Sequence, residues 1–110
     1  MQETEKPRWL PCRITVLKRH HNTDLIEQYV LEHKRALYQP CPRHIEGQEF
    51  YLAKPEKPDD FCSWAWADIF KEVLTIMSGG IFPNSKEPNG VIASCTDGLR
   101  PVVFRVSADK

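Results

Sequence analysis

The stretch DFCSWAWADIFKEVLTIMSGG, residues 60–80, decides the fold because its apolar residues recur with the period of an α-helix. At roughly 100° per residue, one stripe collects Cys62, Trp66, Ile69, Phe70, Val73 and Met77. Asp59 and Asp60 supply capping carboxylates just before the segment, and Gly79 and Gly80 supply residues that take the left-handed conformation at a helix end. We therefore expect one long amphipathic helix.

The outer face of this helix carries a tryptophan among polar side chains. Trp64 shares that face with Asp68, Lys71 and Thr75, so the indole should meet a surface other than the main core. The sequence allows three environments for it: the underside of the proline-rich loop at residues 81–90, the wall of a ligand-binding cleft, or a dimer contact. Trp64 is therefore a candidate for binding a ligand or cofactor.

Other segments have the alternating pattern of β-strands. Residues 12–18, CRITVLK, and residues 48–52 alternate apolar and polar side chains. Towards the C-terminus, VIASC and RPVVFRV flank the sequence Thr-Asp-Gly at residues 96–98, and Asp-Gly is a strong signal for a tight turn. We therefore expect an antiparallel C-terminal hairpin. Its core-facing residues should be Val102, Phe104 and Val106.

A shorter helix is predicted between the first two strands. Asp24 is followed by Glu27 at the spacing of a capping box, and apolar residues continue along one side to a helix end near Arg35. Residues 1–11 are charged and contain prolines, which is typical of a flexible tail. Residues 12–110 are predicted to form a single α+β domain, a mainly antiparallel sheet of about four strands with two helices packed on one face.

Composition narrows the class of protein. The chain has 110 residues with 15 basic and 15 acidic side chains, so no overall field favours nucleic acid or anionic lipid. No apolar run approaches the roughly 20 residues of a membrane-spanning helix, and the polar N-terminus is unlike a secretion signal. We therefore expect a cytoplasmic protein that binds neither nucleic acid nor membrane, with its four cysteines present as thiols or metal ligands.

Several short motifs together give the chain a resemblance to a known family. They are a Cys and a His shortly before GQEF, then FCSWAWADI, GGIFP and CTDGLRPVVF. Over residues 12–106 the combination resembles an uncharacterised family of small prokaryotic-type proteins. No activity is established for that family, so the resemblance implies no reaction. It points to four motif residues, Cys41, His44, Cys62 and Cys95.

The leading hypothesis is a small metal-site protein. Three thiolates and one imidazole, from Cys41, His44, Cys62 and Cys95, make an acceptable tetrahedral set for zinc, with iron as the second choice. Four protein ligands would close the shell of a structural metal, whereas loss of one, His44 first, would leave an open position for water or substrate. The competing interpretation is that Cys62 and Cys95 are small buried side chains, as Cys12 is expected to be.

A second hypothesis is a metal-free enzyme for a small-molecule substrate, of isomerase or lyase type. Cys62 would be its nucleophile or proton donor, because a helix N-terminus favours the thiolate, and His44 would serve as the base. Trp64 would line the cleft, while Asp97 and Arg100 would orient a carboxylate or phosphate of the substrate. The ordinary alternatives are a turn-forming role for Asp97 and a solvated position for Arg100.

A third hypothesis is an interaction module. In this case Trp64 and the proline-rich loop would form the contact between two copies of the chain. The sequence therefore leaves three classes of function open: a metal-site protein, a small-molecule enzyme and a module that forms a homodimer.

Overall fold

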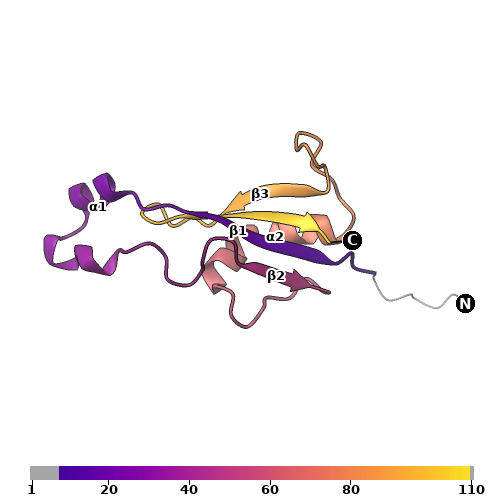
Figure 1. Ribbon diagram of the computed structural model, residues 1–110, viewed down its shortest axis with the longest axis horizontal. Coiled ribbons are helices and arrows are strands. Elements are labelled where there is room, and N and C mark those ends of the chain that lie inside the picture. The colour runs from indigo at the N-terminus through magenta and orange to yellow at the C-terminus, as the bar shows by residue number, and fades with distance from the viewer. Residues whose placement is uncertain (1–7, 110) are drawn as a thin grey trace, which may run out of the picture.

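The computed structural model of the chain describes residues 8–109 (Figure 1). Residues 1–7 of the predicted tail lie outside the described residues. The residues that follow are tied to the body of the domain: the N–H of Leu10 donates to the carbonyl oxygen of Met77 over 2.9 Å, and Trp9 packs against the edge of the core. No helix within the described range is long and apolar enough to cross a membrane.

Four strands form one antiparallel sheet in the order β2-β1-β4-β3. The strands are β1 (Cys12–Arg19), β2 (Glu49–Leu52), β3 (Gly90–Ser94) and β4 (Val102–Ala108). In the two central strands, β1 and β4, Ile14 lies opposite Val106 and Val16 lies opposite Phe104. The α+β class and the four-stranded sheet that the sequence predicts are thereby confirmed.

Helix α2 (Ser63–Met77) covers one face of this sheet (Figure 1). Its inner face buries Ala65, Ile69, Val73, Ile76 and Met77, each at most 2% exposed. The opposing side chains of β4 are Val102, Phe104 and Val106, which are at most 1% exposed, as the hairpin pattern predicts. Burial of each such large apolar side chain contributes roughly 1.5–3 kcal/mol to stability, so this layer holds the domain together.

The predicted stripe of α2 is correct in its middle and wrong at one edge. Trp66 and Phe70 are only half-buried, and their ring centroids lie 5.5 Å apart on the flank of the helix. Ala65 and Ile76 occupy the contact with the sheet instead. Because Ala65 is small, the helix can lie close to the sheet on that side, and the larger rings are turned outward.

The C-terminal end of α2 follows the prediction. Gly79 has φ +87°, the left-handed conformation that a helix end favours for glycine. The N–H of Gly79 donates to the carbonyl oxygen of Ile76 over 3.1 Å, and the N–H of Gly80 donates to that of Thr75 over 2.8 Å. This pair of bonds is a Schellman cap, so the two glycines do end the helix.

The predicted capping of α2 by Asp59 and Asp60 is wrong. The helix begins at Ser63 with Cys62 as its N-cap residue, and the Cys62 side chain makes no capping hydrogen bond. A capping carboxylate bonds N–H groups two or three residues ahead, and both aspartates lie too far upstream to do so. The thiol of Cys62 is left to face another part of the molecule.

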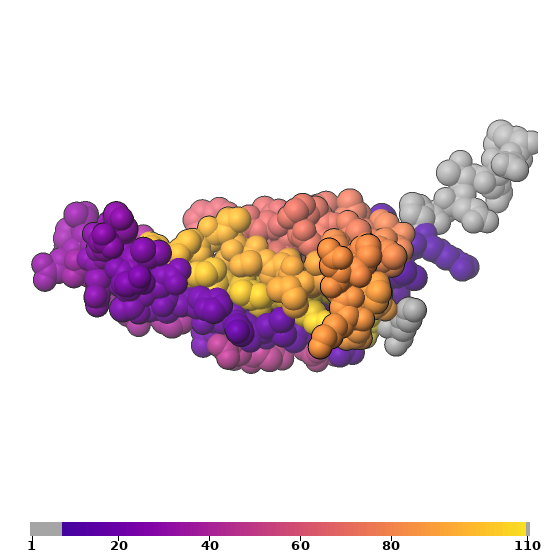
Figure 2. Space-filling view, turned by 90° about the horizontal axis from the view of Figure 1, so that it is seen from above, coloured from indigo at the N-terminus to yellow at the C-terminus, as the bar shows by residue number. Residues whose placement is uncertain are grey.

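The first predicted helix is broken into two short pieces that leave the sheet. They are α1 (Thr23–Tyr29) and η1 (Glu32–Leu37), a 3₁₀ helix, and no side-chain capping bond forms at the start of either. Ile26 is their buried residue, whereas Tyr29 and Leu37 are 74% and 66% exposed. The two pieces form a lobe at one end of the molecule, drawn in purple in Figures 1 and 2. Neither piece contacts a strand or α2, so the predicted stripe has no face of the sheet or of the long helix on which to fold as one helix.

The C-terminal hairpin is confirmed, but its connection is wider than the predicted tight turn. β3 and β4 pair in antiparallel fashion, and residues 95–101 join them. A two-residue Asp-Gly turn needs positive φ at its central residues, and Gly98 does not take a positive φ. Asp97 holds the longer loop instead, because its Oδ1 accepts the N–H groups of Leu99 and Arg100 over 3.0 and 3.2 Å.

Candidate functional site

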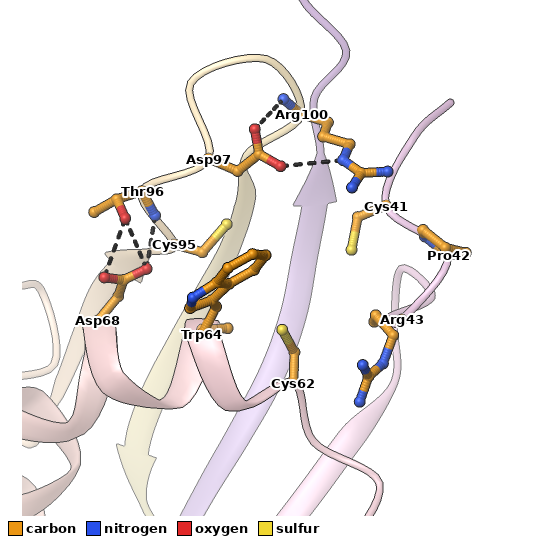
Figure 3. Close-up of a pocket in the computed structure, with 11 residues that line it drawn as sticks. Cys41, Pro42, Arg43, Cys62, Trp64, Asp68, Cys95, Thr96, Asp97 and Arg100 are labelled. Carbon is orange, nitrogen blue, oxygen red and sulfur yellow. Dashed lines mark hydrogen bonds and ion pairs between the residues drawn. The ribbon is translucent and has the colours of Figure 1, made fainter. Parts of the chain in front are cut away.

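A cleft of about 490 Å³ lies at the N-terminal end of α2 (Figure 3). Three segments that are far apart in the sequence form its walls: the loop before β2, the first turns of α2, and the β3–β4 loop. A volume of this size is typical of sites for small molecules. The end of the sheet and the start of the helix thus enclose one candidate site.

This cleft brings together six of the seven residues that the sequence analysis singles out. They are Cys41, Cys62, Trp64, Cys95, Asp97 and Arg100. The seventh, His44, does not line the cleft. The convergence of residues from three segments is a property of the fold and not of any local motif.

The four cysteines divide into two kinds. Cys12 is fully buried in β1, and burial raises the pKa of its thiol to about 11. Cys41, Cys62 and Cys95 are half-buried free thiols, and their sulfur atoms face the cleft from three sides (Figure 3). The core interpretation therefore holds for Cys12, whereas the other three cysteines lie where a ligand can reach them.

Contacts with the sheet position two of the cleft cysteines. Nη1 of Arg19, at the end of β1, donates to the carbonyl oxygen of Cys41 over 3.1 Å and so ties the loop before β2 to the sheet. Sγ of Cys95 accepts the backbone N–H of Val102 over 3.2 Å. The Cys95 sulfur is thus held as a hydrogen-bond acceptor, which is the role that a thiolate plays.

His44 lies beneath the cleft, in the core. Its ring is 1% exposed and packs among Phe50, Phe61 and Phe104, with centroid distances of 5.7, 4.7 and 5.4 Å. Nε2 accepts the backbone N–H of Cys62 over 3.4 Å, and burial lowers the pKa of the imidazole. Both observations indicate a neutral ring whose Nε2 supports the start of α2.

The predicted set of four metal ligands is not assembled in this structure. Within residues 8–109, no group of three or more His, Cys, Asp or Glu side chains is placed to hold a metal ion. Nε2 of His44 points at a backbone N–H, so the geometry gives no support to His44 as a ligand or as a base for Cys62. Zinc and iron stay predictions.

Two carboxylates line the cleft, and hydrogen bonds to the β3–β4 loop occupy both. Besides its bonds to backbone N–H groups, Asp97 accepts Nε of Arg100 at Oδ2 over 3.1 Å. Asp68 accepts the N–H of Thr96 over 2.8 Å and its hydroxyl over 3.0 Å. The turn-forming role of Asp97 is therefore confirmed. Asp68 is a site residue that the sequence analysis missed, although it lies one helical turn after Trp64 on the same face.

Two arginines line the cleft. Arg100 donates through Nε to Asp97, and its guanidinium lies over the ring of Tyr38, 5.5 Å from the centroid. Within the described residues, the two terminal nitrogens of Arg100 and the whole guanidinium of Arg43 make no hydrogen bond to a protein group. Arg43 has no local sequence signal, because only the folded loop before β2 brings it to the cleft.

Trp64 forms one wall of the cleft and is 84% exposed (Figure 3). It does not pack beneath the loop of residues 81–90, which follows the opposite end of the 15-residue helix. That length separates the two by roughly 20 Å along the helix axis. Figure 2 places this loop, in orange, toward the end of the molecule opposite the purple lobe. Of the three environments considered for Trp64, the packing beneath the loop is wrong and the position at a cleft wall is observed, whereas the dimer contact stays a prediction.

The fold and the site define a small α+β protein with a cysteine-lined cleft. No family model, no curated protein and no solved structure matches this chain. The resemblance to the uncharacterised family therefore stays a prediction.

Proposed function

We propose that the cleft binds a thiophilic metal ion, zinc first and iron second, through the sulfur atoms of Cys41, Cys62 and Cys95. One observation carries the proposal: three of the four cysteines, from three separate segments, open onto the same cleft. Zinc and iron favour thiolate ligands, and three cysteine side chains at one cleft can supply them. As part of this proposal the protein is cytoplasmic, where thiols of this kind stay reduced.

Metal binding requires the three sulfur atoms to draw together. Tetrahedral zinc–sulfur bonds of about 2.3 Å need sulfur atoms about 3.8 Å apart, and no side-chain group within residues 8–109 is placed to hold a metal. Cys41 and Cys95 lie outside the helices and strands, whereas Cys62 is fixed at the start of α2. Movement of the two loops toward the helix would complete the site.

The charges around the cleft suit such a centre. Three thiolates and one divalent ion carry a net charge of −1, and the guanidinium groups of Arg43 and Arg100 lie at the same cleft. Asp68 and Asp97 are occupied by the β3–β4 loop and do not compete for the metal. Because His44 supports the helix instead of the cleft, a fourth position stays open to water or substrate, as in a catalytic metal site.

Elemental analysis of protein purified without air or chelating resin tests the proposal, together with thiol titration under native conditions. We expect about one metal ion per chain, with three thiols protected until a chelator is added. Replacing Cys41, Cys62 or Cys95 by serine should lower the metal content, whereas Cys12→Ala, the control in the core, should leave it unchanged. A metal-free protein whose three cleft thiols react freely would overturn the proposal.

A second candidate is a metal-free reaction at Cys62, of isomerase or lyase type. It is favoured by the position of Cys62 as the N-cap residue of α2, with its thiol facing the cleft and not used for capping. In this case the same titration should find no metal and one fast-reacting thiol. That thiol should disappear in Cys62→Ser while the fold is retained.

A third candidate is a homodimer formed through Trp64. The exposure of its indole, 84%, is the observation that favours it. The proline-rich loop lies at the other end of α2, so such a contact would be built around the cleft and not around that loop. Sedimentation of the wild type and of Trp64→Ala at matched concentrations separates this candidate from the other two, which predict no change in oligomeric state.

A further inference from the structure

We infer that the cleft binds a small planar carboxylate, with the indole of Trp64 against its planar part and the guanidinium of Arg100 at its carboxylate. The inference rests on the proposed function in placing the site at this cleft, but it does not require the metal. It names the class of substrate or ligand that the cleft would take. Two features carry it: one flat apolar surface, and the balance of hydrogen-bond donors and acceptors.

Trp64 supplies the flat apolar surface. Its indole is 84% exposed and forms one wall of the cleft, so a large aromatic face is left in contact with water. Exposed apolar surface at the wall of a concave site is typical of ligand binding. A planar ligand that stacks on this face removes the exposure and gains the offset contact that aromatic rings prefer.

Arg100 is held ready for a carboxylate. Its Nε is fixed by Oδ2 of Asp97 over 3.1 Å, and the ring of Tyr38 lies beneath its guanidinium. These two contacts leave the two terminal nitrogens of Arg100 without a partner among the described residues. In Figure 3 these nitrogens point toward the side of the cleft that carries Cys41. The N–H groups of the two terminal nitrogens form a planar fork, which matches the two oxygens of a carboxylate. Arg43 lines the same cleft, but its guanidinium points away from Arg100, so Arg100 alone supplies the fork.

The acceptors in the cleft are already used, whereas the donors are not. Asp97 accepts three hydrogen bonds and Asp68 accepts bonds from both the N–H and the hydroxyl of Thr96. A ligand therefore meets free guanidinium donors and occupied carboxylates, which selects an anion over a cation.

The same balance favours a single negative charge. The charged groups that line the cleft are two arginines and two aspartates, so their charges sum to zero. A phosphate dianion would be repelled by the carboxylates of Asp68 and Asp97, which line the same cleft. A monocarboxylate needs only the arginine fork, so it fits the cleft better.

Nuclear magnetic resonance of ¹⁵N-labelled full-length protein tests this inference. The protein is used as purified, with its metal content measured, and again after treatment with a chelator. The probe is cinnamate, a planar carboxylate, with cinnamyl alcohol, acetate and inorganic phosphate as comparison ligands. The indole N–H signal of Trp64 is assigned by its loss in Trp64→Phe.

We expect saturable shifts of the Trp64 indole signal with cinnamate, at a dissociation constant of about 1 mM or lower. Arg100→Gln should weaken binding roughly tenfold, because it removes charge-assisted hydrogen bonds. Arg43→Gln, which removes a positive charge of the cleft outside this fork, should weaken binding less. Arg100→Lys keeps the charge without the fork and should recover only part of the affinity. Lys54→Gln, which removes an exposed charge outside the cleft, is the matched control and should bind as the wild type does.

Three results would overturn the inference. The first is no saturable shift with cinnamate in either preparation. The second is equal binding of cinnamate and cinnamyl alcohol, which would mean a merely apolar cleft. The third is tighter binding of phosphate than of cinnamate. If the protein contains no metal but binds cinnamate, this inference is supported and the metal proposal fails. If the protein contains the metal but does not bind cinnamate, the metal proposal is supported and this inference fails.

Discussion

Cys12 should make the fold less stable at alkaline pH, and its replacement by alanine should remove that effect. The thiol is fully buried in β1, and burial raises its pKa from 9.0 to about 11. In the unfolded chain the thiol loses its proton first. Between pH 9 and 11 the folded state therefore holds more protons, and the free energy of unfolding decreases as the pH rises.

The size of the effect follows from the pKa difference of Cys12. A difference of about two pKa units corresponds to about 2.7 kcal/mol of stability once the pH exceeds 11, and about half of this is lost by pH 10. For a small domain, whose urea dependence is typically about 1–3 kcal/mol per molar, the loss at pH 10 would lower the urea midpoint by roughly 0.5–1.4 M. Below pH 9 the contribution is fully retained.

Urea unfolding followed by circular dichroism between pH 8 and 10.5 measures this prediction. Cys12→Ala should be less stable than the wild type at pH 8, because it leaves a cavity, but the difference should shrink as the pH rises. Val16→Ala is the matched control: it removes a buried side chain from the same strand without a titratable group, so it should keep the wild-type pH dependence. A constant offset between Cys12→Ala and the wild type over the whole range would refute the reasoning.

Three further predictions concern the start of α2, its C-terminal cap and the β3–β4 loop. His44→Phe leaves a backbone N–H at the start of α2 without its acceptor and should lower the free energy of unfolding by about 1–3 kcal/mol, while elemental analysis should find the metal content unchanged if the ligands are the three cysteines alone. Gly80→Ala places a Cβ 2.6 Å from a neighbouring side-chain carbon and should cost about 1–3 kcal/mol in urea unfolding, whereas Gly98→Ala, with open space around it, should be close to neutral. Asp97→Ala releases Arg100 and should weaken cinnamate binding severalfold, measured by the same resonance shifts, with the circular dichroism spectrum of the fold retained.

The sequence predicts the sheet and α2 because their signals are local and periodic. Apolar residues alternate in β1 and β4, and those faces are buried in the fold. The cap at Gly79 is likewise set by two adjacent glycines. The broken first helix has the opposite cause: its pattern is equally periodic, but Ile26 is the residue of α1 that reaches a core, because the sheet ends before the lobe begins. The periodicity of apolar residues in a segment does not indicate whether the folded chain offers a surface against which they can pack.

The cleft was predictable in its members and not in its geometry. Cysteine, tryptophan and arginine carry recognisable chemistry, so six of its residues can be named from sequence. Which of them are free depends on contacts across the chain: Asp97 is occupied by its own loop, whereas Asp68 reaches Thr96 only because α2 lies beside the β3–β4 loop. His44 is the clearest case, because the rings that bury it come from residues 50, 61 and 104.

His44 links the core to the cleft. The short spacing between Cys41 and His44 therefore joins a cleft residue to a core residue, and does not place two metal ligands side by side. The first N–H groups of a helix lack partners within it, and that of Cys62 is satisfied by the buried imidazole. Because aromatic rings hold the imidazole on several sides, the start of α2 is fixed against the sheet. The backbone positions from which Cys62 and Trp64 extend toward the cleft are fixed with it. One short loop therefore supplies a wall of the cleft through Cys41 and, three residues later, the support that keeps the opposite wall in place.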